Sequence, residues 1–244
     1  MPTWLEFAWA SFLYGAIGGD KDYQQIMSNS ELLNLLRSCP QNLSTDEIQE
    51  LIIEGFLNRW KCRLPNTPST ASSIRDALND LQPQLQVIAG HTLRDPMSTH
   101  VNKNTQSNLT LGEVIEQCYS ILRGCARSFA ATATSKLLHV IRPSLFVMWD
   151  AFILDHYQKQ DSHIKDTGEG YAFFHEQMRK LVLAVDQAFA GANLSPQPAN
   201  DQSVEDYLST HMRYTPSKTA AKFVDEYNWV VITNEVNVPP AWHP

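Results

Sequence analysis

The stretch LGEVIEQCYSILRGCARSFAATATSKLLHVIRPSLFVMWDAFILDHY, residues 111–157, decides the fold that we expect for this chain. Its pattern predicts a helix over about 112–123, a tight turn, a short helix over about 134–141 and then an apolar stretch. Asp150 begins the next helix, where a carboxylate is a favourable N-cap. Successive helices with short connections indicate a mostly α-helical protein.

The remainder of the 244 residues also favours helices. Ser44 and Glu47 form a capping-box pattern, and apolar residues at helical spacing follow them to about Lys61. A helix over 73–89 is predicted to break at Pro83, and residues 229–244 are predicted to be extended. Polar segments at 90–110 and 191–203 are typical of a loop and a linker. We expect one mostly helical domain over 1–244.

That domain is predicted to have two lobes with a cleft between them. Residues 1–105 together with the C-terminal helices would form one lobe, and residues 110–190 would form the other. The composition is that of a globular protein, with 43% hydrophobic and 18% charged residues. No apolar run is long enough to cross a bilayer, and the N-terminal stretch lacks the basic region of a signal peptide. We therefore expect a cytoplasmic monomer without a membrane partner.

The four cysteines show no CxxC spacing, which argues against a zinc ribbon or an iron–sulfur loop. We expect no metal and no cofactor. The net charge of −7 argues against a protein that binds nucleic acid over its whole surface. Residues 117–149, however, contain four Lys or Arg residues and no Asp or Glu. This segment is either a buried stretch with few charges or a basic footprint on an acidic protein. A second basic cluster, Arg59, Lys61 and Arg63, surrounds Trp60.

The order of elements over 111–157 resembles the helix-hairpin-helix DNA glycosylase superfamily. In that family the hairpin typically reads G-V-G-x-K, and a catalytic Asp follows at a helix start. Here Thr132–Lys136 would occupy the hairpin, in a motif near 112–141, and Asp150 would occupy the aspartate position. The hairpin glycines are absent, and only 14 positions separate Lys136 from Asp150, fewer than is usual in the family.

The resemblance implies an enzyme that flips a modified or damaged base out of double-stranded DNA and hydrolyses its N-glycosidic bond. Asp150 would stabilise the sugar cation and position water, and an intact abasic site would remain, as for a monofunctional glycosylase. The breadth of the family implies that the excised base could be hypermodified, as in antiviral defence against phage DNA. The residues expected to contact DNA are Lys136, Arg123, Arg127, Ser135, Thr134 and Arg142. The residues expected to form the base pocket are Trp60, Trp149, Tyr227 and Trp229.

Several residues also have a purely structural interpretation. Asp150 can be a simple N-cap, and His139 a buried histidine with satisfied hydrogen bonds. Asp225 and Glu226 are expected to be solvated or to cap a helix. The alternative function is therefore a non-catalytic helical module that binds nucleic acid or another protein.

Overall fold

The computed structural model describes residues 2–38, 40–101, 108–192, 203–214 and 217–239. These residues form eleven α-helices, and within those ranges there is no β-strand, only one isolated bridge between His100 and Thr110. The prediction of a mostly α-helical protein is thus confirmed. The predicted loop at 90–110 and linker at 191–203 include residues 102–107 and 193–202, which lie outside the described part.

The helical elements have the following bounds. They are α1 (Trp4–Ala16), α2 (Gly19–Met27), α3 (Ser30–Ser38), the 3-10 turn η1 (Pro40–Asn42), α4 (Thr45–Glu47), the π-helix η2 (Ile48–Asn58), α5 (Pro68–Val87), α6 (Leu111–Gly124), α7 (Ala131–Ile141), α8 (Ala151–Gln160), α9 (Gly168–Ala190), α10 (Val204–Met212), α11 (Ala220–Asn228) and the π-helix η3 (Trp229–Thr233).

Local capping signals set several of these helix starts. Ser44 and Glu47 make the expected capping box at α4, and Thr110 makes another at α6 with Glu113. Asp150 caps α8 through its side chain. Such caps accept hydrogen bonds from the free N–H groups of the first helical turn, and each typically stabilises the protein by about 1 kcal/mol.

Three local predictions are wrong. Thr132–Lys136 lie within α7, where the N–H of Thr134 bonds to the carbonyl of Ala130, so the connection after α6 is 125–130 and not the predicted hairpin. Helix α5 continues through Pro83 because fully buried leucines hold both sides of that residue in the core. Residues 229–233 form η3 and are not extended, since this segment continues the hydrogen bonding of α11.

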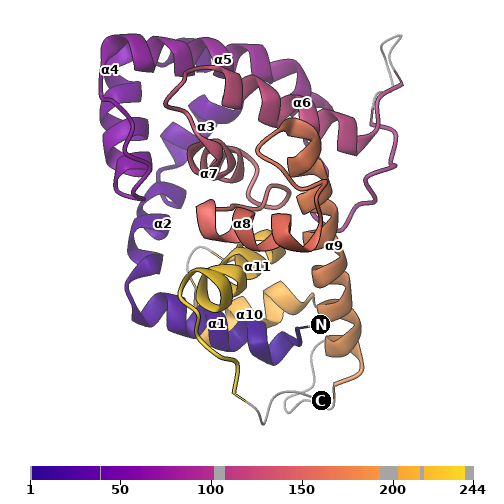
Figure 1. The fold of residues 1–244 in the computed structure, drawn as a ribbon. Helices are drawn as coiled ribbons and strands as arrows, with labels where there is room; N and C mark the ends of the chain where they lie inside the picture. The colour runs from indigo at the N-terminus through magenta and orange to yellow at the C-terminus, as the bar shows by residue number, and fades with distance from the viewer. Residues whose placement is uncertain (1, 39, 102–107, 193–202, 215–216, 240–244) are drawn as a thin grey trace.

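Two sets of contacts organise the helices. Helix α6 packs along α9 and α5, and α1 packs on α11, so the N-terminal helix lies beside the C-terminal one. Helix α9 extends along one side of the molecule from α6 to α10 (Figure 1). Within the described ranges, every helix is too short or too polar to span a bilayer.

Candidate active site

A cleft of about 830 Å³ opens beside the start of α8. Its walls come from the α1–α2 junction, the turn after η2, α7, and α11 with η3. These segments are far apart in the sequence, so only the tertiary fold brings them together. In Figure 1, α7, α8 and α11 occupy the middle of the view, with α2 and α9 at its two sides.

Asp150 lies in this cleft as the N-cap of α8. Its Oδ1 accepts hydrogen bonds from the backbone N–H groups of Phe152 and Ile153, both at 2.9 Å. Its Oδ2 accepts a bond from the hydroxyl of Thr233 at 2.8 Å. Three donors and the positive end of the helix dipole therefore stabilise a negative charge at this position.

Ser135 fixes the backbone that leads to Asp150. Its hydroxyl donates to the carbonyl of Trp149 at 3.0 Å and accepts from the N–H of the same residue at 3.1 Å. Ser135 and Thr134 are both fully buried, and the Thr134 hydroxyl donates to the carbonyl of Ala130. The expected contact of these two hydroxyls with DNA is therefore wrong for this conformation, because neither reaches solvent.

Lys136 lines the cleft from the second turn of α7. Its Nζ donates to the backbone carbonyl of Trp60 at 2.7 Å and lies 5.4 Å from the centroid of the Trp60 ring. Burial lowers the pKa of Lys136, although the nearby carboxylates of Asp225 and Asp150 oppose that shift. A cation thus lies near the Asp150 carboxylate.

Two of the predicted aromatic residues line the cleft with partly exposed side chains. Trp60 stacks on Tyr23, with ring centroids 6.0 Å apart and an interplanar angle of 20°. Trp229 packs edge-on against Tyr14 at 5.1 Å. Both indoles are only partly buried, so each retains surface that a flat ligand can contact.

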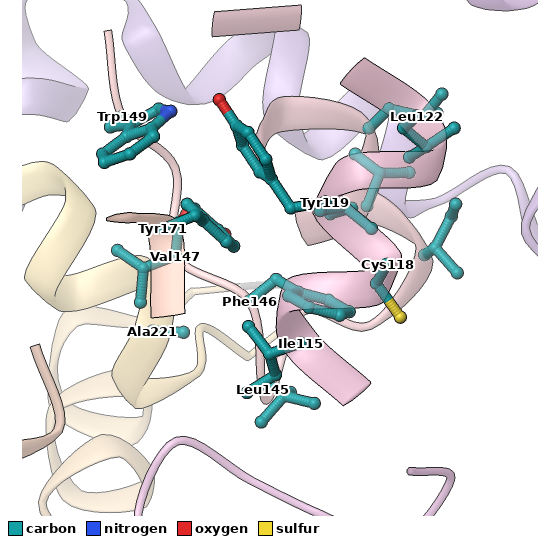
Figure 2. Close-up of a cluster of buried hydrophobic side chains, with 14 of the residues drawn as sticks. Ile115, Cys118, Tyr119, Leu122, Leu145, Phe146, Val147, Trp149, Tyr171 and Ala221 are labelled. Atoms are coloured by element: carbon teal, nitrogen blue, oxygen red, sulfur yellow. The ribbon is translucent and has the colours of Figure 1, made fainter. Parts of the chain in front are cut away.

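Of the other two predicted base-pocket residues, Trp149 borders the cleft without presenting its ring to it, and Tyr227 lies elsewhere. The Trp149 side chain is fully buried in the core, where its ring contacts Tyr119 and Tyr171 (Figure 2). Tyr227 lines a separate pocket together with Tyr157. Tyr227 follows Asp225 by two positions in α11, so the two side chains leave the helix on different sides. The proposed stacking role is wrong for Trp149, because no base can reach its ring.

The basic residues of 117–149 do not gather at the cleft. Arg123 forms an ion pair with Asp166 at 3.0 Å, and Arg142 donates to the backbone carbonyls of Ile141 and Leu85. Arg127 is exposed and does not line the cleft. Apart from Lys136, this segment therefore uses its cations to hold the fold or leaves them away from Asp150.

The second basic cluster does line the cleft. Arg59, Lys61 and Arg63 are exposed along its rim, and none of them forms an ion pair with another described residue. Lys61 and Arg63 adopt the left-handed backbone region, with φ of 62° and 55°. Such conformations are uncommon for residues other than glycine and occur often at functional sites.

Sequence reasoning missed a buried charge cluster next to the cleft, formed by Asp20, Lys218, Lys222, Asp225 and Glu226. Asp225 and Glu226 are 6% and 0% exposed, so the expectation that they are solvated is wrong. Lys222 contacts Asp225 at 2.8 Å, while Lys218 contacts Glu226 at 2.9 Å and Asp20 at 2.7 Å. The i, i+3 and i, i+4 spacing of charges in KFVDE was the available signal.

Within the described ranges, no three His, Cys, Asp or Glu side chains are grouped closely enough to hold a metal ion. No family model matches the chain, and neither a curated protein nor a solved structure does. The chemistry of the cleft is therefore interpreted from its own residues.

Proposed function

We propose that the protein is a DNA glycosylase, which hydrolyses the N-glycosidic bond of a modified base that has left the DNA stack. One observation carries the proposal: the Asp150 carboxylate lies in a cleft that also presents two partly exposed indoles and a basic rim. A carboxylate, flat apolar faces and cations are the three components that a flipped nucleotide needs.

The position of Asp150 suits stabilisation of a sugar cation. As the bond to the base breaks, positive charge develops at the anomeric carbon, and a fixed carboxylate lowers the energy of that charge most effectively where water is scarce. The bonds to Phe152, Ile153 and Thr233 hold the carboxylate in place before the reaction. Asp150 can also orient a water molecule for attack on the same carbon.

The dimensions and walls of the cleft suit a base. Its volume of about 830 Å³ lies within the range of roughly 300–1,000 Å³ that small-molecule sites occupy. Trp60 and Trp229 offer surfaces for stacking, which is worth about 1–3 kcal/mol per base. Arg59, Lys61 and Arg63 would neutralise phosphates around the extruded nucleotide, although the protein as a whole is acidic.

The decisive experiment replaces Asp150 with Asn. The amide still caps α8, so the free energy of unfolding should fall by well under ~1 kcal/mol. Loss of the charge should slow base release on the order of 100-fold or more. Release is measured in single-turnover reactions on duplexes that each carry one modified base, including N7-methylguanine, hypoxanthine, uracil and a hypermodified pyrimidine. Asp155→Asn, which removes an exposed carboxylate from the same helix, is the matched control.

We also propose that the reaction is hydrolytic and leaves the strand intact. The Lys136 Nζ donates to the Trp60 carbonyl, which holds the amine in place instead of leaving it free to attack the sugar. Borohydride reduction in the presence of substrate should therefore trap no covalent complex with DNA. Burial lowers the pKa of Lys136, which favours its neutral amine. Attack of that amine on the sugar is therefore the main alternative to hydrolysis by water. A covalent complex that is trapped with the wild type and absent with Lys136→Gln would establish attack by the Lys136 amine.

A second candidate function is a non-catalytic nucleic-acid-binding module. The observation in its favour is that Asp150 already has three intramolecular donors, which is sufficient for a structural cap. This candidate predicts that the wild-type protein binds DNA in a salt-dependent manner but releases no base from any duplex of the panel. It also predicts the same DNA affinity for Asp150→Asn as for the wild type.

A further inference from the structure

Asp225 places a second carboxyl group in the cleft that contains Asp150. It comes from α11, which packs on α1, and its side chain is almost completely buried. Its Oδ2 accepts a hydrogen bond from the Lys222 ammonium at 2.8 Å, while its Oδ1 has no hydrogen-bond partner among the described residues. One oxygen is therefore held in place and the other is available to a ligand.

The groups that surround Asp225 come from several elements. Lys222 is its ion-pair partner within α11, and electrostatic interactions also reach it from Lys136 in α7 and from Asp150 at the start of α8. Tyr14 of α1 and Tyr23 of α2 cover the Lys222 ammonium, with ring centroids 4.1 and 4.7 Å from its Nζ. Aromatic rings thus surround the ammonium of this ion pair, and one of them, Tyr14, also lines the cleft.

The charges of this region do not balance when every group is ionised. The buried charge cluster has three carboxyl groups, Asp20, Asp225 and Glu226, and only two ammonium groups. Lys136 and Asp150 add one charge of each sign, so a single negative charge remains in excess among these seven groups. The cations of the rim are exposed and are not part of this count. Burial raises the pKa of Asp225 and also that of Glu226, and their lysine partners offset only part of that effect. A low-dielectric region with surplus negative charge favours the binding of one proton.

We propose that Asp225 is a second catalytic residue, a general acid that protonates the departing base while Asp150 stabilises the sugar cation. This inference rests on the glycosylase function proposed above. Two carboxyl groups in one site, one fixed by three hydrogen-bond donors and the other surrounded by surplus negative charge, are the arrangement by which enzymes separate an acid from a charge stabiliser.

The step balances as a hydrolysis. The C1′–N bond breaks, and its electron pair remains on the base while a ring atom of the base takes the proton from the Asp225 carboxyl. Asp225 is then a carboxylate paired with Lys222. A water molecule adds its oxygen to C1′ and releases one proton, which restores the Asp225 carboxyl through solvent. The products are the neutral base and an abasic sugar with a hydroxyl at C1′.

The test separates bases that need a proton from a base that does not. N7-methylguanine already carries a positive charge, so its departure requires no general acid, whereas hypoxanthine, uracil and hypermodified pyrimidines leave as anions unless they are protonated. Asp225→Asn should slow single-turnover release of a neutral base on the order of 100-fold. The same variant should slow release of N7-methylguanine by less than about 5-fold, on the same scale of general-acid contributions.

The pH dependence gives a second measurement that needs no variant. Release of a neutral base by the wild type should decrease as pH rises and Asp225 loses its proton, while release of N7-methylguanine should not decrease over the same range. Asp225→Glu should restore part of the rate and the same dependence. Asp155→Asn, which removes an exposed carboxylate that neither belongs to the buried charge cluster nor lines the cleft, is the matched control and should retain the wild-type difference between the two kinds of base.

Each result bears on the proposal. Equal losses for cationic and neutral bases in Asp225→Asn, or a wild-type rate that does not depend on pH for a neutral base, would overturn the assignment of Asp225 and leave Asp150 untouched. A wild type that releases no base from any duplex would overturn the glycosylase function and this inference with it. If Asp225→Asn does not fold, the wild-type profiles and Asp225→Glu decide the question.

Discussion

Two basic segments of this chain look alike in sequence and differ in the structure. Residues 117–149 contain four cations and no acid, and residues 59–63 contain three cations around a tryptophan. In the first segment Arg123 is paired with Asp166 and Arg142 with backbone carbonyls. In the second, all three cations are exposed on the rim of the cleft.

The difference shows that a local count of charges does not identify a binding surface. The tertiary fold decides where each cation lies and which group it contacts, and those contacts come from distant parts of the chain. Asp166 is 43 residues from Arg123 in the sequence, so no local pattern predicts this ion pair. The rim, formed by Arg59, Lys61 and Arg63, and the 117–149 segment should therefore respond differently to substitution.

The largest expected effect is on DNA affinity. The triple variant Arg59→Gln, Lys61→Asn and Arg63→Asn removes the rim charges, while Asn still tolerates the left-handed backbone at 61 and 63. Affinity for duplex DNA at 50 mM salt should fall on the order of 100-fold. The slope of log affinity against log salt should become shallower by about 2.7, because each neutralised phosphate contributes about 0.9. Fluorescence anisotropy with a labelled duplex measures both.

The matched control removes three exposed cations that do not line the cleft, in the variant Arg127→Ala, Lys165→Ala and Lys180→Ala. It changes the net charge by the same amount and should leave the salt slope close to that of the wild type. A slope that changes equally in the two triple variants would mean that the rim has no special role. A larger change of the salt slope in the control variant would indicate that DNA binds near Arg127 and not at the rim.

The second effect concerns the pH dependence of stability, which we expect to depend on two buried histidines, His139 in the 117–149 segment and His175 in α9. Burial lowers the pKa of His139 to about 3, and burial lowers that of His175, which bonds to the carbonyl of Leu145, to about 4. Between pH 6.5 and 4 the unfolded chain binds two protons that the folded protein excludes. The free energy of unfolding should therefore fall with decreasing pH, with these two residues contributing about 2.7 kcal/mol per pH unit.

Urea unfolding at several pH values measures this slope. His175→Gln keeps a donor for the Leu145 carbonyl and removes one titrating group, so it should reduce the slope by about 1.4 kcal/mol per pH unit. The rim triple variant should leave the slope unchanged, since it touches neither histidine. An unchanged slope in His175→Gln would show that the histidine is protonated in the folded protein as well.

The smallest effect is that of Arg123. Arg123→Ala removes the ion pair with Asp166 and a hydrogen bond to the carbonyl of Phe129, at a side chain about one third exposed. We expect a loss of roughly 1 kcal/mol in the free energy of unfolding and no change in the salt slope for DNA. Thermal unfolding and anisotropy on the same sample test both parts. A wild-type melting temperature together with weaker DNA binding would contradict the structural role.

The sequence was most informative where local chemistry dominates. The capping boxes at Ser44 and Thr110 and the cap at Asp150 were predictable because a short polar side chain satisfies N–H groups two or three residues away. The presence of most helices was also readable from apolar spacing, whereas the π-helical geometry of η2 and η3 was not. The continuation of α5 through Pro83 was not, since tertiary packing there outweighs a local preference.

The candidate site was only partly predictable for the same reason. Asp150, Lys136, Trp60 and Trp229 were each chosen from local patterns, and the fold brings all four to one cleft. The partners of these residues come from contacts across 76 or 83 positions, such as Lys136 with Trp60 and Asp150 with Thr233. The buried position of Asp225 depends on α1 and α2 covering Lys222, which no pattern within α11 reveals.

The backbone of the rim turn implies a trade-off between robustness and activity. Lys61 and Arg63 hold left-handed conformations that cost a residue with a Cβ roughly 1–2 kcal/mol each, a strain that glycine would relieve. Selection for heat resistance alone would therefore favour glycine at both positions. Such a protein would unfold at a higher temperature and lose two of the three cations of its rim, so laboratory evolution for thermostability should be monitored for loss of the proposed DNA binding.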